Sequence, residues 1–183
     1  MHDAGRRDVL KAVVATAAGA LAGIAPGANA EDGLLNSRPL MTVRISAAPP
    51  QRFGPVPHGS RIFVPVSGGE FEGPRLRGKV LPGGGDWLLL RSDGVLELDL
   101  RITLETDDHV LIYMTFQGLR HGPSDAIAAL GRGEVVDPAR YYFRTLPRFE
   151  TSAERYAFLN RIITVGRGEA RPDGATHRIE EIL

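Results

Sequence analysis

The chain has 183 residues, 22 basic and 22 acidic, and no cysteine, so its formal net charge at neutral pH is zero. This balance offers no electrostatic field for nucleic acid or an anionic membrane surface, and the absence of cysteine excludes disulfides and thiolate chemistry. A hydrophobic core must therefore supply the stability.

The first 30 residues have the features of an export signal. The pair Arg6-Arg7 precedes a weakly apolar, alanine-rich run over residues 12–25, and Ala28-Asn29-Ala30 has the small-residue pattern of a cleavage site. The run is shorter than the roughly 20 residues that a membrane-spanning helix needs. We expect a twin-arginine signal peptide over residues 1–30, a tether over 31–38, and a periplasmic or secreted protein without membrane attachment after cleavage.

Residues 39–183 are expected to form one all-β domain. Short runs alternate apolar and polar residues and are separated by Gly, Pro and Asp, as in strands connected by turns. No interleaved helix is long enough for a parallel crossover, so the pattern predicts an antiparallel barrel or sandwich with two short helices at 124–130 and 152–160. The runs cover residues 41–47, 60–66, 75–81, 87–91, 95–105, 109–117, 141–145, 161–165 and 177–183.

The run from Val95 onward is the most regular of these. Successive side chains of a strand point to opposite faces, so Leu98 and Leu100 share one face, and Asp99 and Arg101 share the other. The apolar face is expected to be dry.

A hairpin connection over residues 106–108 is expected to join this strand to the next. In that register Arg101 lies opposite Tyr113, and Asp99 lies opposite Thr115. A slip by one residue would mix the apolar and polar faces, which the sequence pattern disfavours. The pattern therefore predicts the two faces more firmly than it predicts which residues pair.

The polar face of this hairpin has two interpretations. If it meets water, Asp99 and Arg101 form a surface ion pair that contributes about 0–1 kcal/mol and has no functional meaning. If it lines a wet lumen, the apolar face packs against a helix or another subunit, and the charges must pair and stay hydrated. Composition alone favours the first interpretation.

A glycine run, Gly83-Gly84-Gly85, precedes Asp86 and Trp87. It lacks the Lys-Ser/Thr ending and the following helix of a phosphate loop, so a tight turn into a strand is expected. Asp86 is a candidate general acid or base, a role that requires an apolar environment to raise its pKa.

Tyr142 and Arg144 lie two residues apart and project from one face of their strand. A guanidinium beside a phenol suits a carboxylate, enolate or phenolate ligand, and an ion pair between Arg144 and Glu150 is an equally good interpretation. The histidines after residue 30 have no metal-ligand spacing, and no motif indicates a metal, nucleotide, haem or flavin site.

Several motifs, in order, resemble the DUF3237 or UPF0311 family from about residue 39 to the C-terminus. Most members of that family have glycine after the paired aspartates, where His109 stands in this chain. The motifs are GPVP at 54–57, GSR at 59–61, PVSGGEFEGP at 65–74, LPGGGDW at 81–87, DG at 93–94, LDLR at 98–101, TDD at 106–108, YYFRT at 141–145 with Pro147, FET at 149–151 and LNR at 159–161.

This resemblance implies an antiparallel β-barrel of the calycin-like kind and a biochemical role that is uncharacterised. It also implies that ionisable strand residues belong to the signature of the family, which favours the wet-lumen interpretation by analogy. The polar residues in the matching motifs are Arg61, Asp86, Asp99, Arg101, Tyr142 and Arg144.

We therefore expect an exported antiparallel calycin-like β-barrel that binds a small aromatic or carbonyl-bearing molecule without a cofactor or metal. One alternative is a cofactor-free isomerase, cyclase or lyase in which an aspartate moves a proton while Arg101 or Arg144 stabilises an enolate-like intermediate. Another is an oligomeric interaction protein whose leucine face is the seam between subunits. The catalytic candidates are Asp86 and Asp99, and the expected ligand-binding residues are Arg61, Trp87, Arg101, Tyr113, Tyr142 and Arg144.

Overall fold

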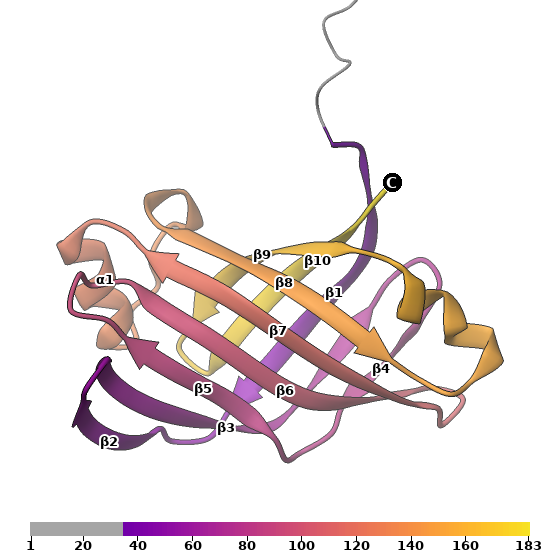
Figure 1. The fold of residues 1–183 in the computed structure, drawn as a ribbon, viewed down its shortest axis with the longest axis horizontal. Coiled ribbons are helices and arrows are strands. Elements are labelled where there is room, and N and C mark those ends of the chain that lie inside the picture. The colour runs from indigo at the N-terminus through magenta and orange to yellow at the C-terminus, as the bar shows by residue number, and fades with distance from the viewer. Residues whose placement is uncertain (1–34) are drawn as a thin grey trace, which may run out of the picture. The chain divides into compact units, whose positions relative to one another are not determined.

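The computed structural model describes residues 35–183, so the expected signal peptide and most of the expected tether lie outside the described residues. The first strand begins at Ser37, within the segment expected to be a tether, and the described part contains ten strands, one α-helix and two 3₁₀ segments (Figure 1). The elements are β1 Ser37–Ala47, β2 Gln51–Val56, β3 Gly59–Glu72, β4 Arg77–Val80, β5 Gly85–Leu90, β6 Leu96–Thr106, β7 Leu111–His121, α1 Ser124–Gly131, η1 Pro138–Arg140, β8 Tyr142–Glu150, η2 Glu154–Arg161, β9 Thr164–Arg171 and β10 Gly174–Ile182.

The strands form a closed antiparallel β-barrel, one of the two architectures that the alternating sequence pattern predicted and the one that the family resemblance implied. From β6 to β10 each strand pairs with the next, β10 pairs with β1, and β1 pairs with the second half of β3. β4 and β5 occupy successive stretches between β3 and β6, and β2 pairs with the first half of β3. Every pairing is antiparallel because short turns, rather than helical crossovers, connect the strands.

The apolar faces of the strands fill the barrel. In β6, Leu98, Leu100 and Leu104 are at most 6% exposed, and in β7, Ile112 and Met114 are fully buried. This is the face that the interaction-protein alternative needed as a seam, so it is not available to a second subunit.

Asp99 and Arg101 lie on the outer wall, and the wet-lumen interpretation of their face is therefore wrong. The Oδ2 atom of Asp99 accepts a hydrogen bond from Arg101 at 3.3 Å, and the two side chains are 38% and 61% exposed. They form the surface ion pair of the first interpretation. The physical reason is that burying the leucine face stabilises the fold by about 25 cal/mol per Å², whereas burying charges costs several kcal/mol per ion.

The β6–β7 hairpin keeps the predicted faces but not the predicted register. Arg101 pairs with Thr115 instead of Tyr113, a shift of two residues that leaves every side chain on its face. The loop is longer than expected because the chain turns through His109, whose amide donates to the Thr106 carbonyl at 2.9 Å. His109 has a φ of 62°, in the left-handed region that favours glycine.

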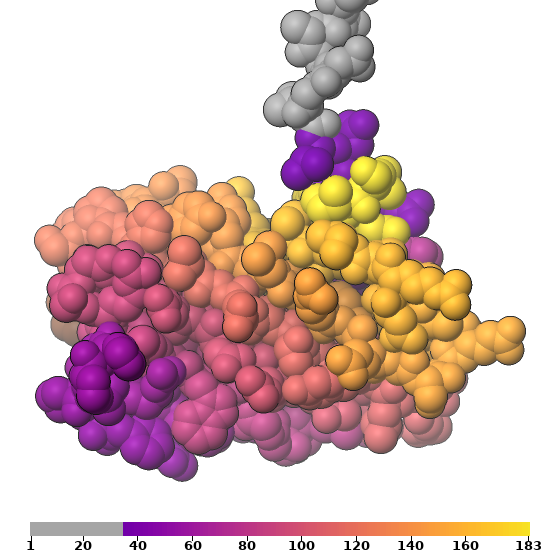
Figure 2. Space-filling model, in the orientation of Figure 1, coloured from indigo at the N-terminus to yellow at the C-terminus, as the bar shows by residue number. Residues whose placement is uncertain are grey.

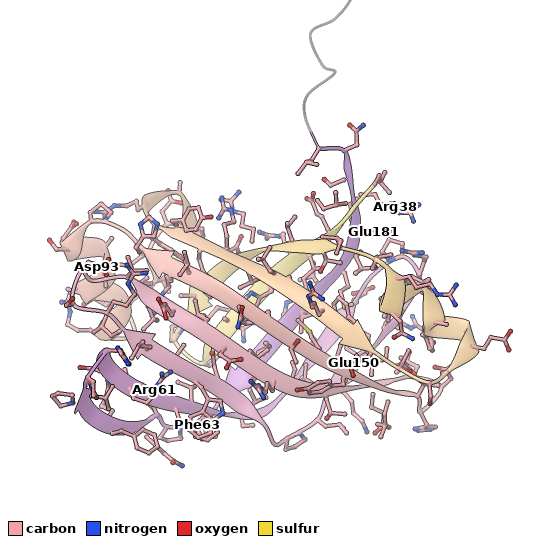
Figure 3. The ribbon with its side chains drawn as sticks, in the orientation of Figure 1. Arg38, Arg61, Phe63, Asp93, Glu150 and Glu181 are labelled. Carbon is pink, nitrogen blue, oxygen red and sulfur yellow. The ribbon has the colours of Figure 1, made fainter. Side chains whose placement is uncertain are left out.

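One end of the barrel is sealed by an ion-pair cluster. Glu181 is 6% exposed and accepts hydrogen bonds from Arg38 at 2.8 Å and from Arg75 at 2.7 Å. Figure 3 shows Arg38 and Glu181 beside each other. The guanidinium carbon of Arg75 also lies 3.8 Å from the ring centroid of Phe158 in η2, so η2 covers this end.

The helix α1 lies at the opposite end of the barrel (Figure 1). It follows β7 closely, as expected for residues 124–130, and it buries Ala126. The second expected helix forms as the 3₁₀ segment η2. Between residues 35 and 183, no helix has the length and apolar character needed to span a membrane.

Candidate functional site

A cavity of about 470 Å³ lies inside the barrel at the α1 end. Leu96, Leu98 and Leu100 of β6 border it, whereas Ile102 and Leu104, further along the same strand, belong to the packed core at the sealed end. Its rim includes residues 47–50, the turn over 171–174, and Leu130 of α1. The wall is mostly apolar, and its large side chains include Leu88, Leu96, Leu98, Leu100, Phe116 and Phe143.

The glycine turn before β5 directs Asp86 into this cavity. The chain reverses through Gly83 and Gly84, which have φ values of 107° and 69°, as the sequence predicted for a tight turn. Asp86 then pairs with Leu100 of β6 and shares its inward direction. Trp87 is the next residue, points outward and is 42% exposed.

Burial raises the pKa of Asp86 to about 7 from its ordinary value of 3.8. A hydrogen bond from the backbone amide of Asp99 to Oδ1, at 2.9 Å, and the positive charge of Arg120 oppose this rise without cancelling it. A carboxyl group with this pKa exchanges a proton near neutral pH, which is the condition for an acid–base role.

Arg120 of β7 brings a guanidinium group to the same cavity. It pairs with Leu96 on one side and Phe143 on the other, and its guanidinium carbon lies 5.7 Å from the centroid of the Phe143 ring. Burial lowers the pKa of Arg120, while Tyr141 and Asp86 act to raise it. None of the ion pairs formed within residues 35–183 includes Arg120. A partly buried cation without a bound carboxylate favours a ligand that carries an anionic or carbonyl oxygen.

His177 of β10 also borders the cavity and is 1% exposed. Its ring centroid lies 4.8 Å from that of Phe116 and 5.2 Å from that of Phe143. Burial lowers the pKa of His177 to about 4, so the imidazole is neutral at pH 7. The Nδ1 atom has no hydrogen-bond partner in the described part of the chain.

Of the residues that the sequence singled out, Asp86 alone lines the cavity, and the expectation that the others face the lumen is wrong. The strand parity that buries leucine and phenylalanine sends them outward. They occupy two depressions of the outer wall, whose surface Figure 2 shows. The first, of about 820 Å³, includes Arg61, Trp87, Asp99, Tyr142 and Arg144, and the second, of about 610 Å³, includes Asp99, Arg101 and Tyr113.

The ion-pair interpretation of Arg144 is wrong. Its Nη1 atom donates to the carbonyl of Phe143 at 3.0 Å, and it forms no ion pair with Glu150. Tyr142 and Arg144 project from one face of β8, as predicted, but this is the outer face, and the guanidinium carbon lies 5.1 Å from the tyrosine ring centroid.

Sequence reasoning missed Arg120 and His177. Each stands at a core position of its strand, since Arg120 shares its face with Phe116, and His177 shares its face with Ile179. A charged or imidazole side chain at a position whose neighbours on that face are apolar is a signal that the sequence contained. Metal-ligand spacing was the wrong criterion for His177.

The chain is similar to proteins of one family. The DUF3237 family model, described as a protein of unknown function, matches residues 35–182. A UPF0311 protein of Rhodopseudomonas palustris is 37% identical over 130 residues, which make up 71% of this chain and 85% of that protein. Its crystal structure, described as a conserved protein of unknown function, matches with a TM-score of 0.80 and 33% identity over 82% of this chain and 99% of that chain.

Two further crystal structures share the fold. One, described as a beta-barrel like protein from Acinetobacter baumannii, matches with a TM-score of 0.72 and 34% identity over 82% of this chain and 97% of that chain. The other, described as an enzyme from Penicillium herquei, matches with a TM-score of 0.62 over 81% of this chain and 95% of that chain. Its identity is 19%, a level at which the likeness shows the fold alone.

Proposed function

The chain belongs to the DUF3237 family, and we propose that its barrel binds a small molecule in the cavity at the α1 end. One observation carries this proposal: a carboxyl group with a pKa of about 7, Asp86, and the guanidinium of Arg120 border a cavity whose wall is otherwise mostly apolar. Ionisable groups with perturbed pKa values in a concave apolar site are typical of ligand-binding and active sites.

The wall of the cavity defines the class of ligand. A volume of about 470 Å³ lies within the range of small-molecule sites, about 300–1,000 Å³. Phe116 and Phe143 suit a flat ring, Asp86 donates or accepts a hydrogen bond according to its protonation, and Arg120 donates to a carbonyl or phenolate oxygen. The ligand is therefore an apolar, aromatic or carbonyl-bearing molecule with few polar atoms.

Titration with N-phenyl-1-naphthylamine, a neutral aromatic dye that fluoresces in apolar surroundings, tests this assignment. The protein should bind the dye saturably, and Leu88→Phe, which places a larger side chain on the cavity wall, should weaken binding at least fivefold. The matched control is Leu119→Phe, because Leu119 lies on the outer wall, and this substitution should leave the affinity for the dye unchanged. Equal effects of the two substitutions, or no saturable binding, would contradict a luminal site.

A second candidate function, proton transfer, is favoured by the pKa of Asp86. The ionised carboxylate takes a proton from the carbon beside a carbonyl group, the C–H electron pair forms the enolate double bond, and the carbonyl π pair moves to oxygen. Arg120 stabilises the negative oxygen. Return of the proton to the opposite face of the same carbon inverts its configuration. In a β,γ-unsaturated ketone, return of the proton at the γ-carbon shifts the double bond, and no electrons are gained or lost in either isomerisation.

The probe for this candidate is 2-tetralone, a neutral aromatic ketone with acidic α-protons. In D₂O, the wild-type protein should accelerate loss of the α-proton NMR signals, with a rate that rises with pH around 7, where Asp86 ionises. Asp86→Asn should abolish the acceleration. An equal exchange rate with the wild-type and substituted proteins would exclude Asp86 as the base and leave binding as the function of the cavity.

Export belongs to the same proposal. It is supported by Arg6-Arg7, the alanine-rich run over 12–25 and Ala28-Asn29-Ala30. The barrel would then act in the periplasm or outside the cell, where a cysteine-free fold with a packed core needs no redox partner.

A further inference from the structure

We propose a second binding site, on the outer wall of the barrel, for a planar aromatic carboxylate. The site is the groove of about 820 Å³ that crosses β3, β5, β6, β7, β8 and β9, and it is called the outer groove below. It lies on the opposite side of the wall from the luminal cavity, as the neighbours Asp86 and Trp87 show, since Asp86 borders the cavity and Trp87 borders the groove.

The charges of the outer groove select an anion. Its two carboxylates are already neutralised, because Asp99 pairs with Arg101, and Glu97 pairs with Arg91 at 3.2 Å. Its two guanidinium groups are not: Arg61 donates to the carbonyl of Trp87 at 3.0 Å, and Arg144 donates to the carbonyl of Phe143 at 3.0 Å. Neither forms an ion pair within residues 35–183.

The register of the neighbouring strands adds a further positive charge beside the groove. Arg144 of β8 lies directly opposite Arg167 of β9, and like charges in that position repel each other. Arg167 also takes part in no ion pair among the described residues. An anion bound at Arg144 would relieve this repulsion, and a carboxylate matches the forked geometry of a guanidinium.

The aromatic side chains of the outer groove select a flat ring. Trp87 is 42% exposed, and its ring stacks on Phe63 with centroids 4.2 Å apart, so one side is backed and held in place. Figure 3 shows Phe63 and Arg61 close together on this wall. Tyr142 is 43% exposed and stacks on His121 with centroids 4.9 Å apart. Each exposed ring thus has a supporting ring and lies in the same groove as a guanidinium that has no carboxylate partner. An aromatic carboxylate can pack its ring against the exposed edge of Trp87 or Tyr142 while its carboxylate meets a guanidinium.

The test uses 4-nitrobenzoate as the probe and the fluorescence of Trp87, the single tryptophan of the chain, as the signal. The probe should quench this fluorescence saturably, and Arg61→Gln and Arg144→Gln should each weaken binding at least fivefold. The matched control Arg148→Gln removes an arginine from the same strand and face but outside the outer groove, and should change the affinity less than twofold. The neutral analogue 4-nitrobenzamide should bind at least fivefold more weakly than the carboxylate.

Asp86→Asn and Leu88→Phe alter the luminal cavity and so distinguish binding there from binding in the outer groove. Both should leave the affinity for 4-nitrobenzoate unchanged. Loss of quenching in these two variants, with retention in Arg61→Gln and Arg144→Gln, would assign the probe to the cavity and overturn the outer site. Equal affinity for the carboxylate and the amide would overturn the role of the guanidinium groups. Failure of the outer site leaves the luminal proposal intact, since binding of N-phenyl-1-naphthylamine tests that proposal separately.

Discussion

Replacing Asp86 by asparagine should stabilise the barrel in mildly alkaline solution. Asparagine has nearly the same shape, and its side-chain oxygen still accepts the hydrogen bond from the Asp99 amide. The folded protein holds the Asp86 proton up to about pH 7, whereas the unfolded chain loses it near the ordinary pKa of 3.8. The free energy of unfolding of the wild type should therefore fall as pH rises from about 4 to about 7, and this contribution should be constant above that range.

The magnitude follows from the two pKa values of Asp86. At 1.36 kcal/mol for each pH unit, the difference between about 7 and 3.8 corresponds to about 4 kcal/mol. Asp86 keeps some contact with water, so we halve this figure and expect the advantage of Asp86→Asn over the wild type to grow by about 2 kcal/mol between pH 4 and pH 8.

The assay is urea unfolding of the wild type and Asp86→Asn at intervals from pH 4 to pH 8. Only the difference between the two proteins isolates Asp86, because His177 titrates in an overlapping range with the opposite sign. The control Asp107→Asn removes an exposed carboxylate and should show no such growth. If the difference between the wild type and Asp86→Asn is the same at every pH, burial does not raise the pKa of Asp86 in the folded protein.

Three further substitutions and one double substitution test other parts of the account. As pH falls from about 6.5 to about 4, the buried neutral His177 should lower the free energy of unfolding of the wild type by about 3 kcal/mol, and His177→Leu should remove this loss. If the free energies of unfolding of the two proteins change with pH in parallel, the low pKa of His177 is disproved. Glu181→Gln should lower the free energy of unfolding at pH 7 by about 1–3 kcal/mol. An unchanged free energy of unfolding would show that the ion pairs of Glu181 do not stabilise the barrel. His109→Gly should raise it by about 0.5–1 kcal/mol by relieving the left-handed backbone, and a decrease would count against that strain. Lysine at both Arg6 and Arg7 should retain the protein in the cytoplasm, and immunoblots that still find it in the periplasm would contradict twin-arginine export.

The barrel was predictable because several runs, above all that of β6, alternate apolar and polar residues. Leu98 and Leu100 identify the inner face of β6 in the sequence alone, and the resemblance to a barrel family agreed with that pattern. The register of the β6–β7 hairpin was less accessible, because it depends on the left-handed conformation of His109, and non-glycine residues adopt that conformation uncommonly. The sequence pattern predicted the second helix but did not distinguish an α-helix from the 3₁₀ form that the structure shows over Glu154–Arg161.

The candidate site was only partly predictable. The sequence singled out Asp86 as a candidate acid or base, and the structure places it on the cavity wall, but its raised pKa depends on neighbours that the sequence does not place beside it. The error over Asp99 and Arg101 arose from weighting the family resemblance above the preference for a dry leucine face. Arg120 was missed because a charged residue on an inner face was not expected without a partner.

NMR mapping of backbone amide shifts in a titration with N-phenyl-1-naphthylamine tests the central claim most directly. If the ligand binds inside the barrel, saturable shifts should be concentrated around the luminal cavity, at Asp86, Leu88, Leu98 and Arg120. Shifts confined to the outer wall around Leu119 and Tyr142, or spread over the surface without saturation, would contradict a ligand site inside the barrel.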